Sequence, residues 1–177
     1  MGAIEYYSYN DYIQWEGNWE LINGYPLMMA PSPMISHQML ASLVLVELSN
    51  SLKCEECIVI CEQDWKVSDE TIVKPDVVMI CNEPHGSYIT KPPKVVVEVI
   101  SKSTARRDEV TKFELYEKEK VPYYIIVYPN DLKAKVYKLK NSKFDKVDDF
   151  TNEVMNFNDL ECGGSIDFEK VFKRFRK

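Results

Sequence analysis

The sequence lacks the long apolar run that a membrane-spanning helix requires. None of its apolar stretches approaches the roughly 18 consecutive residues that such a helix needs. The first five residues also lack the charged, apolar and cleavage regions of a signal peptide. We therefore expect a cytoplasmic protein that does not enter a membrane.

An excess of positive charge is also missing. The formal net charge is −6, which argues against a protein that holds nucleic acid by its bulk charge. A local basic cleft is still compatible with this value, because a protein that binds a metal through carboxylates lowers its own net charge. Domains commonly hold roughly 100–200 residues, so we expect residues 1–177 to form a single domain.

The cysteines lack the pairing that a zinc site or a secreted scaffold would show. There are five of them, an odd number, and they are scattered along the chain. Cys54-Glu55-Glu56-Cys57, with Cys61 nearby, resembles half of a zinc site. No second pair follows at a suitable spacing, and the chain has only two histidines. Without a secretion signal we expect reduced thiols.

What the sequence does contain is a mixture of strand and helix patterns. Asn23-Gly24 predicts a tight hairpin between strands at 19–22 and 25–30. Further strands are expected at 57–67 (one or two), 76–80, 95–100, 123–127, 134–140 and 143–147, and helices at 8–16, 36–52, 103–120 and 166–175. The strand–helix–strand unit from Val95 to Val127 favours an α/β fold with a mixed β-sheet flanked by helices.

One stretch, Val73 to Ser101, carries two carboxylates inside apolar runs. Asp76 begins the first run and Glu98 interrupts the second. Burying a carboxylate is costly unless a charged or hydrogen-bonding group meets it. If the two strands are neighbours, both carboxylates can face one cleft and bind a hard cation such as Mg²⁺. Alternatively, Asp76 caps a turn after Pro75 and Glu98 meets a buried lysine or arginine.

Several motifs also occur in a set order along the chain. They are Trp19-Glu20-Leu21-Ile22-Asn23-Gly24, Ala30-Pro31-Ser32-Pro33 with His37, Lys74-Pro75-Asp76-Val77-Val78, Val97-Glu98-Val99-Ile100-Ser101-Lys102-Ser103-Thr104, Asp108 with Lys112 and Tyr116, and Val121-Pro122-Tyr123-Tyr124. Each motif is weak alone, but the ordered set is specific. Over about residues 8–140 it resembles the Uma-two family of restriction endonucleases, within the PD-(D/E)XK nuclease superfamily.

The resemblance implies a restriction-endonuclease-like α/β fold, a Mg²⁺ or Mn²⁺ cofactor and DNA as the substrate. It implies that Asp76 is the acidic residue of the "PD" half and Glu98 that of the "(D/E)XK" half. Both residues would be metal ligands in the catalytic site. Restriction enzymes of this type often act as dimers, so a homodimer is also an expectation.

The chain departs from the superfamily pattern at the lysine. Two residues after Glu98 stands Ile100, which cannot orient the attacking water or balance charge. Lys112 is the first candidate to replace that lysine, because it lies on a partly apolar helical face with Asp108 and Tyr116. The alternative is a surface lysine that extends its ammonium into water. Lys102 is the second candidate.

Two other residues are candidates for the same site. Glu20 precedes the hairpin turn, and related nucleases bring an early glutamate to the metal, although a structural salt bridge is the competing interpretation. His37 lies on the apolar stripe of the 36–52 helix. It is either a hydrogen-bonded core histidine or a contact to phosphate or metal-bound water near the cleft mouth.

The preferred hypothesis is a metal-dependent endonuclease acting on DNA. Asp76, Glu98 and Glu20 hold Mg²⁺ or Mn²⁺, and Lys112 assists the attacking water. A catalytically inactive member of the same fold, binding nucleic acid or a protein partner, is the alternative that the missing lysine favours. Hydrolysis of another phosphate ester would use a site that looks alike.

Overall fold

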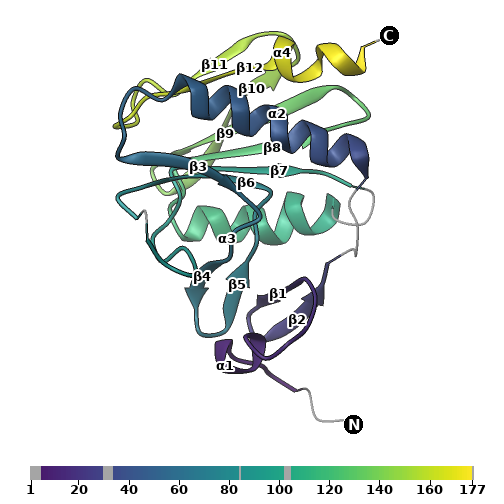
Figure 1. The fold of residues 1–177 in the computed structure, drawn as a ribbon, viewed down its shortest axis with the longest axis vertical. Coiled ribbons are helices and arrows are strands. Elements are labelled where there is room, and N and C mark those ends of the chain that lie inside the picture. The colour runs from purple at the N-terminus through teal and green to yellow at the C-terminus, as the bar shows by residue number, and fades with distance from the viewer. Residues whose placement is uncertain (1–4, 30–33, 84, 102–104, 177) are drawn as a thin grey trace.

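A six-stranded mixed sheet forms the centre of the protein in a computed structural model that describes residues 5–29, 34–83, 85–101 and 105–176 (Figure 1). Its strand order is β10-β9-β8-β7-β6-β3. Only β7 and β8 run parallel, and the other neighbours are antiparallel. The strands are β3 (Cys57–Cys61), β6 (Val77–Cys81), β7 (Val95–Val99), β8 (Tyr123–Tyr128), β9 (Lys133–Lys140) and β10 (Lys143–Phe150).

Two smaller antiparallel sheets accompany it. One has the order β2-β1-β5-β4, made of β1 (Trp19–Ile22), β2 (Tyr25–Met28), β4 (Trp65–Ser68) and β5 (Thr71–Val73). The other pairs β11 (Val154–Asn156) with β12 (Ser165–Asp167). Asn23 and Gly24 both have positive φ, 51° and 79°, which a tight hairpin turn between β1 and β2 requires. The predicted hairpin is therefore confirmed.

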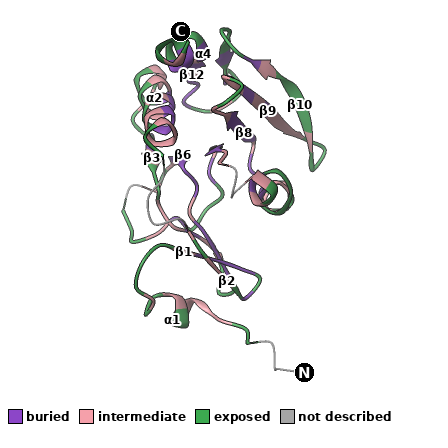
Figure 2. Ribbon diagram, turned by 90° about the vertical axis from the view of Figure 1, so that its right-hand side faces the viewer, coloured by how far each residue is buried: buried purple, intermediate pink, exposed green. Residues whose placement is uncertain are grey.

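Helices cover both faces of the central sheet. The described helical segments are α1 (Tyr9–Tyr12), which lies beside the small β2-β1-β5-β4 sheet, α2 (Ile35–Ser51), a π-helix (Arg107–Lys112) that continues into α3 (Phe113–Lys118), α4 (Phe168–Phe172) and a 3₁₀ turn (Lys173–Phe175). α2 and α4 lie on one side of the sheet and α3 on the other (Figure 1). Figure 2 shows α2 with its buried residues toward the sheet. The predicted α/β class with a mixed sheet flanked by helices is confirmed.

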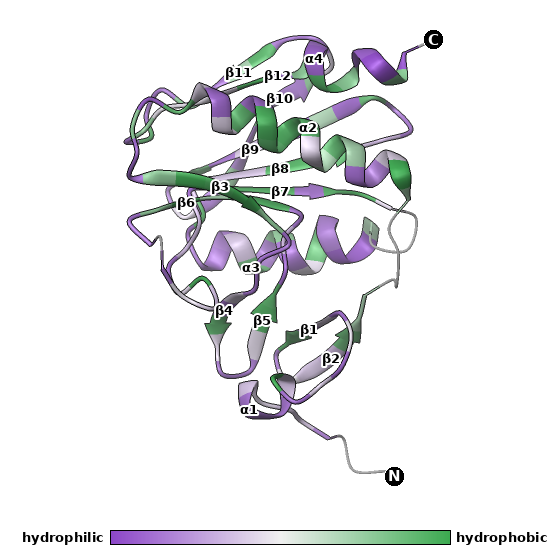
Figure 3. Cartoon of the chain, viewed as in Figure 1, coloured by the Kyte–Doolittle hydropathy of each residue, from purple (hydrophilic) through white to green (hydrophobic). Residues whose placement is uncertain are grey.

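The central strands bury side chains on both faces. Val97 and Ile125 pack in the core under α2 and α4, whereas Val96 and Ile126 pack in the core beside α3. Apolar residues run along these strands, interrupted in β7 by a hydrophilic segment (Figure 3). Because side chains alternate along a strand, Glu98 shares the face of Val96 and lies toward α3.

Some predicted elements differ from the structure. The helix expected at 8–16 covers only Tyr9–Tyr12, and the 57–67 region is two strands that belong to different sheets. The helix expected at 103–120 contains a π-helical segment, and its predicted cap at 103 or 104 lies outside the described residues. β11 and β12 were not predicted, because three-residue strands carry too little periodicity to recognise.

The expectation of reduced thiols is wrong for four of the five cysteines. Disulfides join Cys54 to Cys162 and Cys57 to Cys81, and Cys61 is free and exposed. The bridged residues are 108 and 24 positions apart in sequence. Such pairs become visible only when the strand register and the packing of the C-terminal segment are known. Among the described helices, none is both long and apolar enough to span a bilayer.

The central sheet should dominate stability. Ile125 in β8 is fully buried, whereas Ile35 at the start of α2 is 87% exposed. Ile125→Ala is expected to lower the free energy of unfolding by about 2–5 kcal/mol, since it removes packed methyl groups and leaves a cavity. Ile35→Ala, the matched control, should change it by less than about 0.5 kcal/mol. Equilibrium urea denaturation measures both, and equal effects would contradict this arrangement of the core.

Candidate active site

Asp76 and Glu98 come from neighbouring antiparallel strands. β6 and β7 pair with Val77 opposite Val97, and continuing this register by one residue sets Asp76 opposite Glu98. Residues directly opposite in an antiparallel pair project from the same face of the sheet. Both carboxylates line one cavity of about 840 Å³. The prediction that the strands of Asp76 and Glu98 are neighbours is therefore confirmed.

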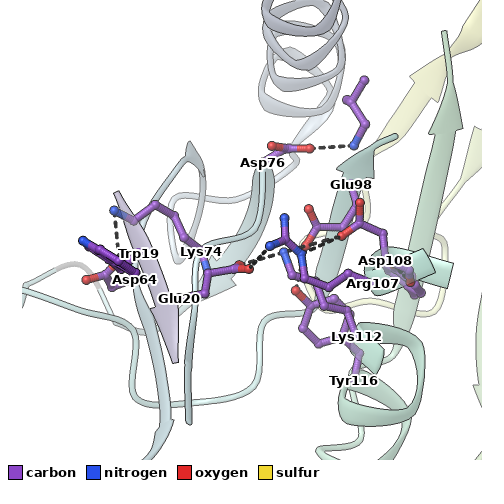
Figure 4. A network of polar contacts seen from close by, with 12 residues as sticks. Trp19, Glu20, Asp64, Lys74, Asp76, Glu98, Arg107, Asp108, Lys112 and Tyr116 are labelled. Atoms are coloured by element: carbon purple, nitrogen blue, oxygen red, sulfur yellow. Dashed lines mark hydrogen bonds and ion pairs between the residues drawn. The ribbon is translucent and has the colours of Figure 1, made fainter. Parts of the chain in front are cut away.

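Glu98 is 3% exposed and is held from the side of the helix that follows it. Lys112 Nζ lies 2.9 Å from Glu98 Oε1, and the Tyr116 hydroxyl donates to the same oxygen at 2.7 Å (Figure 4). Within the described part of the chain, both of these hydrogen bonds use Oε1. The other oxygen, Oε2, is therefore left for a ligand in the cavity.

Asp76 is held by the backbone rather than by a cation. The Val99 N–H donates to Asp76 Oδ2 at 2.6 Å. His37 Nε2 lies 3.3 Å from the same oxygen, and His37 also lines the cavity. Burial lowers the pKa of the His37 imidazole, but its hydrogen bond and attraction to Asp76 outweigh this and raise the pKa overall. His37 thus sits at the cavity wall against a carboxylate, not in an apolar core.

Lys112 is the most deeply buried cation of the site, with a side chain 1% exposed. Its Nζ lies 2.7 Å from Glu20 Oε1 and 2.9 Å from Glu98 Oε1. Burial lowers the pKa of Lys112, but attraction to Glu20, Glu98 and Asp108 outweighs this and raises the pKa above its usual value. Lys112 therefore keeps its proton. The alternative of a surface lysine is wrong.

Glu20 lies behind Lys112 and is fully buried. Its Oε1 accepts a hydrogen bond from the Lys74 N–H at 2.9 Å as well as the contact from Lys112. Its Oε2 lies 3.5 Å from Arg107 Nη1 (Figure 4). Glu20 is not among the residues that line the cavity in the described part of the chain. It therefore contacts the site through the two cations.

The family Uma2, described as "Putative restriction endonuclease", matches residues 7–167. The chain belongs to the Uma2 family. The crystal structure of "a putative nuclease belonging to DUF820 from Anabaena variabilis ATCC 29413" is similar, with a TM-score of 0.75, 12% identity and coverage of 94% of this chain and 97% of that chain. At that identity the likeness shows the fold alone. No curated protein matches the sequence.

In this Uma2 chain, the side chains of Arg107, Asp108 and Tyr116 also belong to the site. The sequence patterns did not assign these three residues to it. Asp108 Oδ1 lies 3.8 Å from Lys112 Nζ and 3.9 Å from Arg107 Nε. Tyr116 bonds Glu98. Asp108, Lys112 and Tyr116 follow one another at intervals of four residues, so their shared helical face was the signal available in the sequence. Lys102, the second lysine candidate, lies outside the described residues.

The Uma2 site holds more negative than positive charge. The carboxylates of Glu20, Glu98 and Asp108 surround the cations of Lys112 and Arg107. Asp76 adds a fourth carboxylate on the wall of the same cavity. Burial raises the pKa of the Glu98 carboxyl well above its usual range, although attraction to Lys112 opposes the rise. The surrounding carboxylates raise it further. A site of this kind gains from a bound cation.

The free carboxylate oxygens fit a hard divalent metal. Asp76 receives its contacts from Val99 and His37 on Oδ2, and Glu98 receives its own on Oε1. One oxygen of each residue is thus unengaged within the described chain, and both residues line the cavity. Oxygen ligands from one or two carboxylates, completed by water and phosphate, are what Mg²⁺ prefers.

Removing the buried ammonium should destabilise the protein. Lys112→Met leaves Glu20 and Glu98 without their shared counter-ion, and breaking a buried ion pair costs about 3–5 kcal/mol. The matched control is Lys118→Met, because the Lys118 side chain is 79% exposed beside Glu119 and surface pairs contribute about 0–1 kcal/mol. Urea denaturation of both variants tests this. Equal stabilities would mean that Lys112 does not compensate the buried carboxylates.

Proposed function

We propose that this Uma2 protein is a metal-dependent endonuclease that hydrolyses phosphodiester bonds in DNA. The observation that carries the proposal is that Asp76, directly before β6, and Glu98, in the neighbouring strand β7, line one cavity beside a buried lysine. Two acidic side chains with a cation next to them are the parts that a PD-(D/E)XK site needs. The membership of the Uma2 family supports the same activity.

Asp76 and Glu98 are the residues that would hold Mg²⁺ or Mn²⁺, with Asp108 as a third carboxylate at the cavity wall. When bound, such an ion polarises the phosphate and offsets charge that develops on its oxygens. The excess of carboxylates over cations in the site supports this assignment. Glu20, an expected ligand, is better placed as the counter-ion of Lys112, and we propose that it positions the lysine.

Lys112 takes the role of the lysine that Ile100 cannot fill. Its pKa is raised, so it acts as a hydrogen-bond donor and a positive charge rather than as a base. From its position beside Glu98 Oε1 it can orient a water or a phosphate oxygen in the cavity. Tyr116 fixes the Glu98 carboxylate from the same helix. His37 and Arg107, which also line the cavity, supply further positive or donor groups for phosphate.

The proposal extends to a cytoplasmic enzyme that meets DNA as a homodimer. Cleaving both strands of a duplex requires two sites, and a closed twofold dimer supplies them symmetrically. The net charge of −6 implies that DNA is held by local contacts at the cavity rather than by the whole surface.

Plasmid cleavage tests the catalytic assignment. The parent protein is expected to nick or linearise supercoiled plasmid with Mg²⁺ or Mn²⁺ and to be inactive with a chelator. Glu98→Gln should abolish cleavage, because it removes a charged ligand while keeping the side-chain shape. Lys112→Met should lower the rate by at least about 100-fold, the loss expected when a hydrogen-bond donor to developing transition-state charge is removed.

Glu114→Gln is the matched control, since Glu114 is an exposed glutamate on the same helix as Lys112. It should cleave at the parental rate. Cleavage that survives Glu98→Gln would overturn the assignment of the site. A parent protein that binds DNA and the metal without cleaving would instead support the inactive nuclease-fold alternative.

Metal binding can be measured without cleavage. Mn²⁺ at about 100 times its dissociation constant should stabilise the folded protein by about 2.7 kcal/mol, seen as a higher melting temperature. Asp76→Asn and Glu98→Gln should each remove this shift. Asp145→Asn, a change at an exposed ion pair with Lys140, should keep it. An unchanged shift in both site variants would place the metal elsewhere.

A further inference from the structure

Four of the five cysteines gather at one corner of the fold. Cys54 follows the end of α2, Cys57 starts β3, Cys81 ends β6 and Cys162 lies in the turn before β12. The sulfur atoms of Cys54, Cys57 and Cys162 all lie within 4.8 Å of one another. The sulfur of Cys81 is bonded to that of Cys57. Three sulfur atoms therefore share one small volume, and the fourth, that of Cys81, adjoins it through Cys57.

The backbone around this cluster holds the segments together independently of the sulfur atoms. Cys57 and Cys81 are direct partners in the β3–β6 register. The Lys53 N–H donates to the Cys162 carbonyl oxygen at 3.0 Å, which fixes the turn against the end of α2. Gly163 has φ +60°, a left-handed conformation that lets the chain reverse directly after Cys162. The four residues would stay close if the sulfur–sulfur bonds were reduced.

The arrangement matches the ligand set of a closed zinc site. Zn²⁺ bound by thiolates is tetrahedral with Zn–S distances of about 2.3 Å, which sets its sulfur ligands roughly 3.8 Å apart. Cys54-Glu55-Glu56-Cys57 has the two-residue spacing of one half of such a site, and Cys162 joins it within 4.8 Å. Cys81, the strand partner of Cys57, is the cysteine placed to supply the fourth ligand. Cys57 and Cys162 are almost fully buried, at 3% and 0% exposure, as suits a structural rather than a catalytic ion.

We propose that the reduced protein binds a single structural Zn²⁺ through the thiolates of Cys54, Cys57, Cys81 and Cys162, and that the two disulfides are the oxidised form of the same site. Disulfides are rare in reducing compartments. A thiol reductant would supply two electrons and two protons to each disulfide and become oxidised itself. Binding one Zn²⁺ to the four thiols then releases four protons.

The site would anchor the C-terminal segment to the central sheet. Cys162 precedes β12 and α4, whereas Cys57 and Cys81 belong to the edge strand β3 and its neighbour β6. Lys53 lies beside the turn, because its Nζ is 3.6 Å from the position that a Cβ atom on Gly163 would occupy. The positive charge of Lys53 can offset part of the negative charge of four thiolates. No cysteine lines the carboxylate cavity in the described chain, so this ion would be separate from the proposed Mg²⁺ or Mn²⁺.

The test is the metal content of the whole chain, produced with zinc in the medium and purified under reducing conditions without a metal-affinity step. Elemental analysis should find about one zinc per chain in the parent protein. Cys61→Ser, at the exposed free cysteine, and Glu98→Gln, in the carboxylate site, should retain it. Cys54→Ser and Cys162→Ser should each lose it.

A measurement on the parent protein avoids reliance on variants that fold poorly. X-ray absorption at the zinc edge should show sulfur ligands only, and Co²⁺ substitution should produce the visible bands of tetrahedral thiolate ligation. A reduced parent protein that takes up no zinc would overturn the proposal. So would zinc that survives Cys162→Ser in folded protein, or zinc that is lost in Glu98→Gln, which would assign the ion to the carboxylates instead.

Discussion

The ammonium of Lys112 is the charge on which the geometry of the site depends. It is buried between Glu20 and Glu98, two carboxylates that are themselves almost inaccessible to water. Taking three charges out of water costs several kcal/mol for each ion, and only close mutual contact offsets that cost. Any rearrangement that separates them would leave an unpaired buried charge. The relative positions of β1, β7 and the helix after β7 are therefore fixed by one another.

This constraint explains the role of the small sheet. β1 pairs with β5, with Leu21 opposite Ile72, and this brings Glu20 next to the segment that leads into β6. The Lys74 N–H then bonds Glu20 two residues before Asp76. The segment from Lys74 to Asp76 thus orients Glu20, the counter-ion of Lys112, and places Asp76 on the cavity wall. The small sheet is part of the support of the site rather than an appendage to the central fold.

Much of this could be predicted from local patterns. Carboxylates inside apolar runs identified Asp76 and Glu98 as unusual, and the helical face shared with Tyr116 identified Lys112. The residues that were missed depend on long-range geometry. Strand pairing, which no local pattern encodes, decides that Glu20 contacts the site through Lys112 and Arg107. It also decides that Cys57 faces Cys81. The π-helix from Arg107 to Lys112 has no recognised sequence signal, although such segments are frequent at functional sites.

β6 connects the two clusters of potential ligands. Asp76 precedes its first residue and Cys81 is its last, so at about 3.3 Å per residue the two lie roughly 17 Å apart along the strand. Carboxylate oxygens suit Mg²⁺ or Mn²⁺, whereas thiolates select softer ions such as Zn²⁺. The difference between carboxylate and thiolate ligands, more than the distance between the two clusters, would keep Mg²⁺ or Mn²⁺ and Zn²⁺ at separate sites. β6 and the residue before it therefore present a carboxylate at one end and a thiol at the other, and the two groups suit different classes of metal ion.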